Sequence, residues 1–215
     1  MTRLAGVQLT PELEDYIESL LPTRDPLMLR LEDEIAASNI PGVGPSVGHL
    51  LSLLVGMAGC RDVNELGTAI GYSAIWLARG SSGSVVTLEL DPARAQRARQ
   101  NLAEAGLADR VRVLQEDGVA YLEREERLVD CIFNDLLNSF VNEATVERCF
   151  ELSLRRLRPG GLLLADNALR RGEVTAARSQ GARNVVRYNE LVARETRLES
   201  VVVPLRDGVS IARLK

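Results

Sequence analysis

The hydrophobic pattern of the chain changes character near residue 60. Before that point apolar residues recur at helical spacing, which predicts two helices over residues 11–21 and 25–39. A break rich in proline and glycine follows at 41–45. The apolar run over 47–57 then predicts a third helix that is largely buried.

From there to the C-terminus, short apolar runs alternate with helical stretches. The runs predict seven strands, at 62–66, 84–89, 111–115, 128–134, 161–165, 200–204 and 209–214. The clearest helix between them, 92–105, has Asp91 as its N-cap and Gly106 as its stop. Strands separated by such helices predict right-handed crossovers and a mostly parallel α/β sheet with helices on both faces. The short turn at 205–208 predicts a C-terminal antiparallel hairpin.

Composition and charge mainly argue against certain classes of protein. The 215 residues, 46% hydrophobic and 26% charged, predict a single domain over 1–215, with an N-terminal helical segment (1–40) and an α/β core (41–215). A formal net charge of −4 disfavours nucleic acid as a partner. The first ten residues lack a long apolar core, and no apolar run reaches the roughly 18 residues that a membrane span needs. Three widely spaced cysteines agree with reduced thiols, so we expect a cytoplasmic protein.

Candidate chemistry lies in the loops that follow the strands, because ligands bind beyond the C-terminal ends of strands in an open parallel sheet. The first such loop contains Gly67 and Gly71, whose G-x-x-x-G spacing lets the backbone turn sharply and approach a ligand. Glu89 ends the next strand, 22 positions after Gly67, where a carboxylate accepts hydrogen bonds from ribose hydroxyls. Each signal alone also fits a structural turn, but together they predict an adenosine-containing ligand. In the third loop, Asp117 and Gly118 either border the adenine or begin the next helix, with Asp117 as its cap.

Two further loops bring polar side chains to the same edge of the sheet. Asp135 follows one buried strand, and Asp166 and Asn167 follow the next. Polar groups directly after buried strands are costly to desolvate unless they have partners. Three oxygen-bearing side chains that converge from neighbouring strands suit a hard cation such as Mg²⁺. As an alternative, Asp135 and Asn167 each cap a following helix.

These segments together resemble a known family, the small cation-dependent S-adenosylmethionine O-methyltransferases of the catechol and caffeoyl-CoA type. The resemblance is carried, in the same order, by ELGTAIGYSAIWLA (65–78), TLELDP (87–92), AEAGLADRV (103–111), RPGGLLLADNAL (158–169) and DGVSIARL (207–214). It implies a class I methyltransferase (Rossmann-like) fold with a seven-stranded sheet and extra N-terminal helices. It also implies a hydroxylated small-molecule substrate and a homodimer.

The resemblance further implies roles for individual residues. The S-adenosylmethionine site would consist of Val43, Glu65, Gly67, Thr68, Gly71, Tyr72, Ser73, Glu89, Leu90, Asp117, Gly118 and Asp135. The cation, Mg²⁺ or in its place Ca²⁺ or Mn²⁺, would be held by Asp135, Asp166 and Asn167. Such a cation aligns a substrate hydroxyl and lowers its pKa, which suits direct methyl transfer.

Two positions depart from the family pattern. Asn138 stands where relatives carry the lysine base of a D-x-x-K motif, and an amide orients a hydroxyl but accepts no proton at neutral pH. Lys215 is the only lysine, so the single histidine, His49, is a candidate for proton transfer unless it is simply packed. Arg170 and Arg171 stand where many relatives carry an aromatic residue. They either bind a substrate carboxylate or phosphate, or are solvated or paired with nearby acids.

Three functions are consistent with these features. The first is an S-adenosylmethionine-dependent O-methyltransferase that acts on a small molecule with the help of a divalent cation. The second is a catalytically degenerate S-adenosylmethionine-binding protein, which the asparagine at position 138 motivates. The third is a nicotinamide-dependent oxidoreductase on a similar sheet, which the glycine spacing disfavours.

Overall fold

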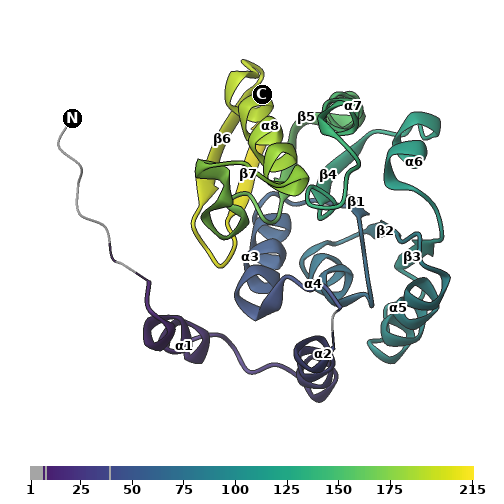
Figure 1. Cartoon of the computed structure of the whole chain (residues 1–215). Helices are drawn as coiled ribbons and strands as arrows, with labels where there is room; N and C mark the ends of the chain where they lie inside the picture. Colours follow the sequence, from purple (N-terminus) through teal and green to yellow (C-terminus); the bar gives the residue numbers. More distant parts are fainter. Residues whose placement is uncertain (1–6, 8, 39) are drawn as a thin grey trace.

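A seven-stranded sheet forms the centre of the computed structural model, which describes residues 7, 9–38 and 40–215 (Figure 1). Its strands are β1 (Asp62–Leu66), β2 (Ser84–Leu88), β3 (Val111–Leu114), β4 (Val129–Asn134), β5 (Leu157–Ala165), β6 (Leu198–Val203) and β7 (Val209–Leu214). The strand order is β3-β2-β1-β4-β5-β7-β6. Strands β1 to β5 are parallel, whereas β7 pairs antiparallel with both β5 and β6. The predicted parallel sheet with a C-terminal hairpin is confirmed.

The helices begin and end close to where the sequence predicts them. They are α1 (Pro11–Ser19), α2 (Pro26–Ala37), α3 (Gly44–Met57), α4 (Tyr72–Gly80), α5 (Pro92–Glu104), α6 (Gly118–Arg124), α7 (Glu143–Arg156) and α8 (Gln180–Arg194), with a 3₁₀ segment η1 (Arg170–Thr175). The third helix starts at Gly44, three residues before its predicted start, because Pro45 is tolerated in a first turn. Asn39, the predicted end of the second helix, lies outside the described residues, as do residues 1–6 and 8.

Apolar side chains cover both faces of the sheet and separate into two clusters. Along β5, Leu162 and Leu164 belong to the cluster beneath α2, α3, α4 and α5, whereas Leu163 and Ala165 belong to the cluster beneath α6, α7 and α8. This alternation follows from the two-residue period of a strand that is buried on both sides. Helices on both faces leave the ends of the strands free to carry a site.

Helix α1 differs from the others because none of its residues is buried. In Figure 1 it lies beside the main body rather than against the sheet. No helix among residues 7, 9–38 and 40–215 has the length and hydropathy needed to cross a membrane.

Candidate active site

The loop between β1 and α4 turns through two glycines in the left-handed region. Gly67 has φ 92° and Gly71 has φ 90°, values that residues with a Cβ rarely adopt. A Cβ at Gly67 would lie 2.9 Å from the side chain of Leu136, and one at Gly71 would lie 3.3 Å from Cα of Ala98. Backbone conformation therefore favours glycine at both positions, and close contacts add to the cost of a larger residue. The loop is a tight strand-to-helix turn at the C-terminal edge of the sheet.

Glu65 is fully buried directly beneath this loop. Its Oε2 accepts a hydrogen bond from Thr87, while Oε1 has no hydrogen-bond partner among the described residues. Burial raises the pKa of Glu65 to about 7, against hydrogen bonds from Ser73, Thr87 and Thr68 that lower it. A cationic group placed in the loop would favour the ionised carboxylate and supply the missing partner. An ammonium group fits this environment.

Glu89 lies next to the same loop, and backbone donors fix its orientation. Its Oε2 accepts from the backbone N–H of Ala69 at 2.9 Å, and its Oε1 accepts from that of Asp91 at 3.0 Å. The neighbouring Leu90 leaves 64% of its surface exposed, as an apolar face at the end of β2. The structure thus brings together the glycine turn and the carboxylate that the sequence pairs with a ribose.

The third loop shows that Asp117 does cap a helix. Its Oδ1 accepts from the backbone N–H groups of Val119 at 3.0 Å and Ala120 at 2.9 Å, at the start of α6. Gly118 is buried, and a Cβ there would lie 3.3 Å from the side chains of Leu136 and Leu66. Capping occupies one carboxylate oxygen of Asp117, so its second oxygen remains for a ligand.

The predicted metal ligands come from the ends of two paired strands. Asn134 and Ala165 are register partners in β4 and β5, so Asp135 and Asp166 continue side by side from the sheet. The alternative, that Asp135 and Asn167 cap helices, is wrong because Asn142 caps α7 and η1 has no side-chain cap. Asn167 has φ 63°, a strained conformation for a residue with a side chain.

Burial and neighbouring negative charge make the two carboxyl groups suited to a cation. The pKa of Asp135 is raised well above its usual value by desolvation and by the charges of Asp166 and Glu65. Burial also raises the pKa of Asp166, to about 6. Oδ1 of Asp166 is buried and has no hydrogen-bond partner among the described residues. A divalent cation would relieve both the repulsion and the missing contact, so these residues fit one.

The amide of Asn138 joins this group through its neighbour. Its Nδ2 donates to Oδ1 of Asn167 at 2.6 Å, while its own Oδ1 is buried without a partner among the described residues. Within the described ranges, no group of three or more His, Cys, Asp or Glu side chains is arranged to hold a metal ion. The candidate set instead combines two carboxylates with one amide.

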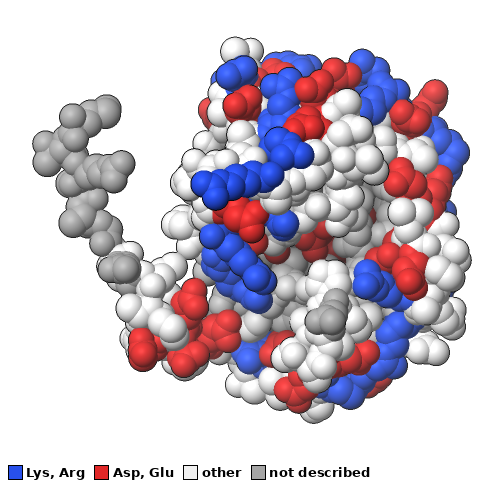
Figure 2. Space-filling view, viewed as in Figure 1, with Lys and Arg blue, Asp and Glu red and all other residues white. Residues whose placement is uncertain are grey.

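A cavity of about 1240 Å³ opens beside these four residues. Asp135, Asn138, Asp166 and Asn167 border it, together with parts of α1, the segment from α2 to α3, η1 and the turn between β6 and β7. Figure 2 shows this hollow near the centre of the view, with acidic atoms inside it and basic side chains along one rim. No aromatic side chain is found among its described lining residues, so it lacks the flat wall that would stack on a phenol ring.

Two other predicted residues lie outside this cavity. His49, on α3, packs its ring 4.2 Å from that of Trp76, and burial lowers its pKa. Tyr72 is buried, and its hydroxyl donates to Glu32 of α2 at 2.7 Å. Val43, in contrast, does border the cavity. The structure therefore brings together the predicted metal ligands, Asn138 and Val43, but neither His49 nor Tyr72.

Arg206 is a lining residue that the sequence analysis missed. It lies in the turn between β6 and β7, and its Nη1 donates to the carbonyl oxygen of Val43 at 2.9 Å. Because β7 runs antiparallel to β5, with Ala165 opposite Ser210, this turn lies beside the C-terminal end of β5. The sequence already predicts this hairpin, and an antiparallel last strand beside β5 places the hairpin turn at the edge of the sheet that carries the site. Arg206 could have been identified from this topology.

Comparisons with known proteins agree with this geometry. The O-methyltransferase family profile matches residues 25–215. A catechol O-methyltransferase of Niastella koreensis is 31% identical over 97% of this chain and 99% of its own. One from Mycobacterium tuberculosis is 35% identical over 77% of this chain and 76% of its own.

The similar solved structures are also O-methyltransferases. An O-methyltransferase from Bacillus cereus, in complex with SAH, has a TM-score of 0.82 at 34% identity, covering 95% of this chain and 97% of that one. The O-methyltransferase TomG from Streptomyces achromogenes, involved in tomaymycin synthesis and in complex with SAM, has a TM-score of 0.82 at 27% identity, covering 95% and 96%.

The fold and the site define a class I methyltransferase. The chain belongs to the O-methyltransferase family, and it is an S-adenosylmethionine-dependent O-methyltransferase. A nicotinamide-dependent oxidoreductase is thereby excluded.

Proposed function

We propose that the chain methylates a hydroxyl group of a small molecule next to Asp135, Asp166 and Asn167, with a divalent cation held by these three residues. The observation that carries this proposal is geometric: Asp135 and Asp166 follow the register-paired ends of β4 and β5, both border the cavity, and Oδ1 of Asp166 is buried without a partner among the described residues. Mg²⁺ is the expected cation, with Ca²⁺ or Mn²⁺ as substitutes, because all three prefer oxygen ligands.

The cofactor side uses residues at the ends of β1, β2 and β3. We assign the amino-acid end of S-adenosylmethionine to the loop above Glu65, whose free oxygen suits an ammonium group. Glu89, held by two backbone N–H groups, faces the ribose hydroxyls. Leu90 and the free oxygen of Asp117 then border the base. The remaining assigned contacts are Val43, Gly67, Thr68, Gly71, Tyr72, Ser73, Gly118 and Asp135.

The chemistry needs alignment and an ionised oxygen nucleophile, because the sulfonium methyl is already a strong electrophile. When bound, the cation stabilises the ionised form of a coordinated hydroxyl. Asn138 supplies a hydrogen-bond acceptor, its unpartnered Oδ1, that orients the substrate hydroxyl. Its Nδ2 holds the amide of Asn167 in place. An amide takes no proton at neutral pH, so the proton leaves to solvent or to another lining residue.

The test is methyl transfer from S-adenosylmethionine to a panel of catechols and simple phenols, followed by mass spectrometry of the product. We expect a mono-methylated catechol in the presence of Mg²⁺ and its loss after chelation, with restoration by added Mg²⁺. Transfer that persists unchanged in the chelated, metal-free protein would contradict the role given to the cation. Binding of the cofactor without transfer to any oxygen acceptor would contradict the proposed reaction.

Asn138 raises the question of how turnover proceeds without the lysine base, because Lys215 is the single lysine of the chain. The substitution Asn138→Lys addresses it. We expect activity in the parent, and activity that appears only in the variant would contradict the proposed reaction.

We also propose that the protein is a cytoplasmic homodimer. Exposed apolar residues in α1, at its C-cap and in α3 support association, since Tyr16, Leu20, Leu53 and Met57 expose between 59% and 84% of their surface. Sedimentation equilibrium tests the dimer, and a concentration-independent monomer mass would contradict it.

A further inference from the structure

The cavity is bordered by arginines whose backbone is strained. Six non-glycine residues in the described part of the chain have positive φ, and three of them are Arg170 (43°), Arg171 (49°) and Arg206 (49°). All three border the cavity. Strain of this kind persists where surrounding structure holds it, and it concentrates at functional sites. The strained backbone thus places three guanidinium-bearing residues around one opening.

Two of these arginines form no ion pair with the carboxylates that the structure describes. Arg170 has Glu173 3.6 Å from its Nε, and it packs against Gly181, where a Cβ would lie 2.9 Å from its guanidinium carbon. Arg171 and Arg206, in contrast, make no ion pair with any carboxylate that the structure describes. Arg170 therefore lies against Glu173 and Gly181, whereas the guanidinium groups of Arg171 and Arg206 are free of ion pairs with described residues.

Arg206 is held in place yet keeps most of its donors. One N–H binds the carbonyl oxygen of Val43, and the guanidinium occupies the space where a Cβ of Gly44 would lie. An arginine has five N–H donors, so the others are available for an anion. Arg206 and Asp166 border the same cavity, so the guanidinium lies on the rim of the proposed reaction centre.

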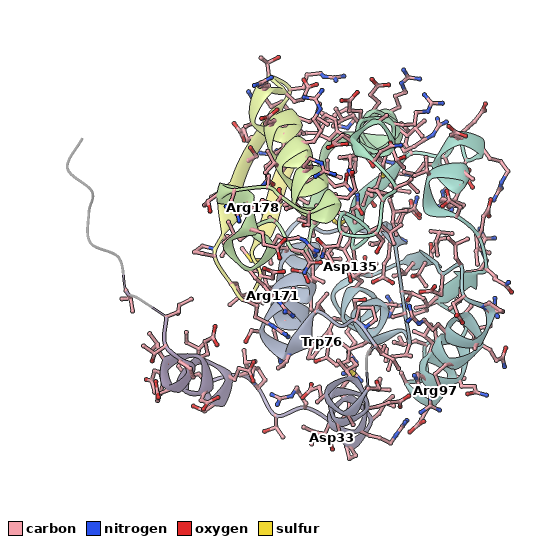
Figure 3. All side chains as sticks on the ribbon, viewed as in Figure 1. Asp33, Trp76, Arg97, Asp135, Arg171 and Arg178 are labelled. Carbon is pink, nitrogen blue, oxygen red and sulfur yellow. The ribbon has the colours of Figure 1, made fainter. Side chains whose placement is uncertain are left out.

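Arg171 faces the same opening from the η1 segment. Its backbone N–H donates to the carboxylate of Asp207, the residue that follows Arg206, so the two arginines are joined through one turn. Figure 3 shows Arg171 near the centre of the view, in the same region as Asp135, whereas Arg178 lies farther from it. Two guanidinium groups at one rim are the arrangement that binds a carboxylate or phosphate.

We propose that the substrate of this cavity carries an anionic group in addition to its hydroxyl, and that Arg206 and Arg171 bind that group. This rests on the proposed function, because it names the substrate class of the same site. The absence of an aromatic wall among the described lining residues agrees with a substrate held by its charge rather than by ring stacking. A carboxylate and a phosphate share this chemistry, so the experiment begins with a carboxylate.

The experiment compares two probes that share a ring and two hydroxyls, 3,4-dihydroxybenzoate and the neutral 3,4-dihydroxybenzamide. We expect kcat/KM to favour the benzoate, and Arg206→Ala to reduce that preference by about tenfold, mainly through KM. The preference is the kcat/KM of the benzoate divided by that of the benzamide. Dividing the preference of the parent by that of Arg206→Ala cancels the difference in intrinsic reactivity of the two probes. Arg206→Lys, which keeps the charge, should retain part of the preference, and Arg171→Ala should lower it.

Arg178→Ala is the matched control, because Arg178 is an exposed arginine between η1 and α8 that does not border the cavity. It should leave both probes unaffected. Equal losses for both probes in Arg206→Ala, or no preference in the parent, would overturn the proposal. Equal losses would instead assign Arg206 to holding Val43, or to pairing with Glu14 and Glu18 of α1 across the cavity.

Binding measured without turnover separates this proposal from the proposed function. Titration calorimetry of each probe uses the chain with S-adenosylhomocysteine and Mg²⁺. Tighter binding of the benzoate that Arg206→Ala abolishes, with no methylation of either probe, would support the anion site and contradict the reaction. Methylation of both probes with equal affinity would support the reaction and overturn the anion site. Adding 3-hydroxyphenyl phosphate as a third probe distinguishes a phosphate from a carboxylate.

Discussion

The cofactor side and the substrate side of this site are built in different ways. At the ends of β1, β2 and β3, glycines in the left-handed region shape the loop above Glu65, and backbone N–H groups position Glu89. At the ends of β4 and β5, the cavity is bordered by side chains from segments far apart in the sequence, among them Val43, Asp166 and Arg206.

This difference in construction indicates which parts of the site tolerate amino-acid substitution. In the proposed assignment, backbone geometry would bind the cofactor, which is the same in every reaction, so a single added Cβ should disturb it. Long side chains on turns would bind the substrate, and such residues can be replaced without altering the fold. We therefore expect changes on the cofactor side to affect every reaction of the protein, and changes on the arginine rim to affect the choice of substrate.

The largest expected effect lies at the reaction centre. Asp166→Asn keeps the shape of the side chain but removes one of two carboxylates, so kcat/KM should fall by at least about 100-fold. The affinity for S-adenosylhomocysteine should stay within about threefold, because Asp166 lies outside the cofactor side. Steady-state kinetics and calorimetry measure the two quantities. If the affinity for S-adenosylhomocysteine fell as much as kcat/KM, the distinction between the cofactor side and the substrate side would not hold.

On the cofactor side, Gly71→Ala should weaken S-adenosylhomocysteine about tenfold. The new Cβ would lie 3.3 Å from the backbone of Ala98 in a conformation with φ 90°, and left-handed backbone costs a non-glycine residue roughly 1–2 kcal/mol. Gly106→Ala is the control, since Gly106 has φ 68° with no atom within 4 Å of the new Cβ. Both variants should lose stability to urea, and only Gly71→Ala should lose cofactor affinity. Equal affinities in the two variants would refute this assignment.

Cofactor binding should also depend on pH through Glu65. Its pKa of about 7 lies above the ordinary 4.5, so the carboxyl is protonated at pH 6 in the free protein. An ammonium group favours the ionised form, so binding releases a proton and affinity rises with pH by up to about tenfold per unit between 6 and 7. Calorimetry in two buffers of different ionisation enthalpy measures the proton release, and Glu65→Gln should abolish it. Proton uptake on binding would be the contrary result.

The same pKa has an opposite consequence for the stability of the free protein. Because the folded state binds the proton of Glu65 more tightly than the unfolded state, this group contributes stability below pH 4.5. That contribution is lost as the pH rises from 4.5 through about 7. In Glu65→Gln, urea titrations should therefore show a smaller decline of stability over this interval.

A smaller effect is expected at Asn138. Asn138→Ala removes the 2.6 Å hydrogen bond to Asn167 and the acceptor that orients the substrate hydroxyl, so kcat should fall by about tenfold. KM for S-adenosylmethionine should be unchanged. Single-turnover rates measure the chemical step, and an unchanged rate would show that this amide does not position the reacting groups.

The smallest effect is expected at His49, which packs on Trp76 and does not border the cavity. His49→Gln should change kcat/KM less than twofold, and the pH profile of kcat should keep its shape. If the rise of kcat with pH near neutrality disappeared in His49→Gln, His49 would instead be the proton acceptor.

The sequence predicts the sheet and the geometry at the ends of β1 and β2 better than it predicts the cavity. Gly67 and Gly71 require special backbone conformations, and Glu89 ends a strand, so local rules identify all three. The convergence of Asp135 and Asp166 follows from parallel strands whose C-terminal ends share an edge.

The remaining parts depend on contacts between distant segments, which local patterns do not encode. The bond between Arg206 and Val43 joins residues 163 positions apart, and only the antiparallel pairing of β7 with β5 brings them together. His49 is the opposite case, a residue that the sequence suggests for the site but the structure places elsewhere. Its imidazole has suitable chemistry for proton transfer, yet it packs against Trp76 rather than bordering the cavity. A helix pattern indicates that such a residue is near a site but not where its side chain points.

A crystal grown with S-adenosylhomocysteine and Mn²⁺ tests the central claim most directly, through the anomalous signal of the manganese. We expect one peak bound by oxygens of Asp135, Asp166 and Asn167, with the homocysteine end of the ligand at the Gly67–Gly71 turn and the ribose on Glu89. A well-ordered ligand in that position without a manganese peak between these three side chains, or with the peak elsewhere, would contradict it.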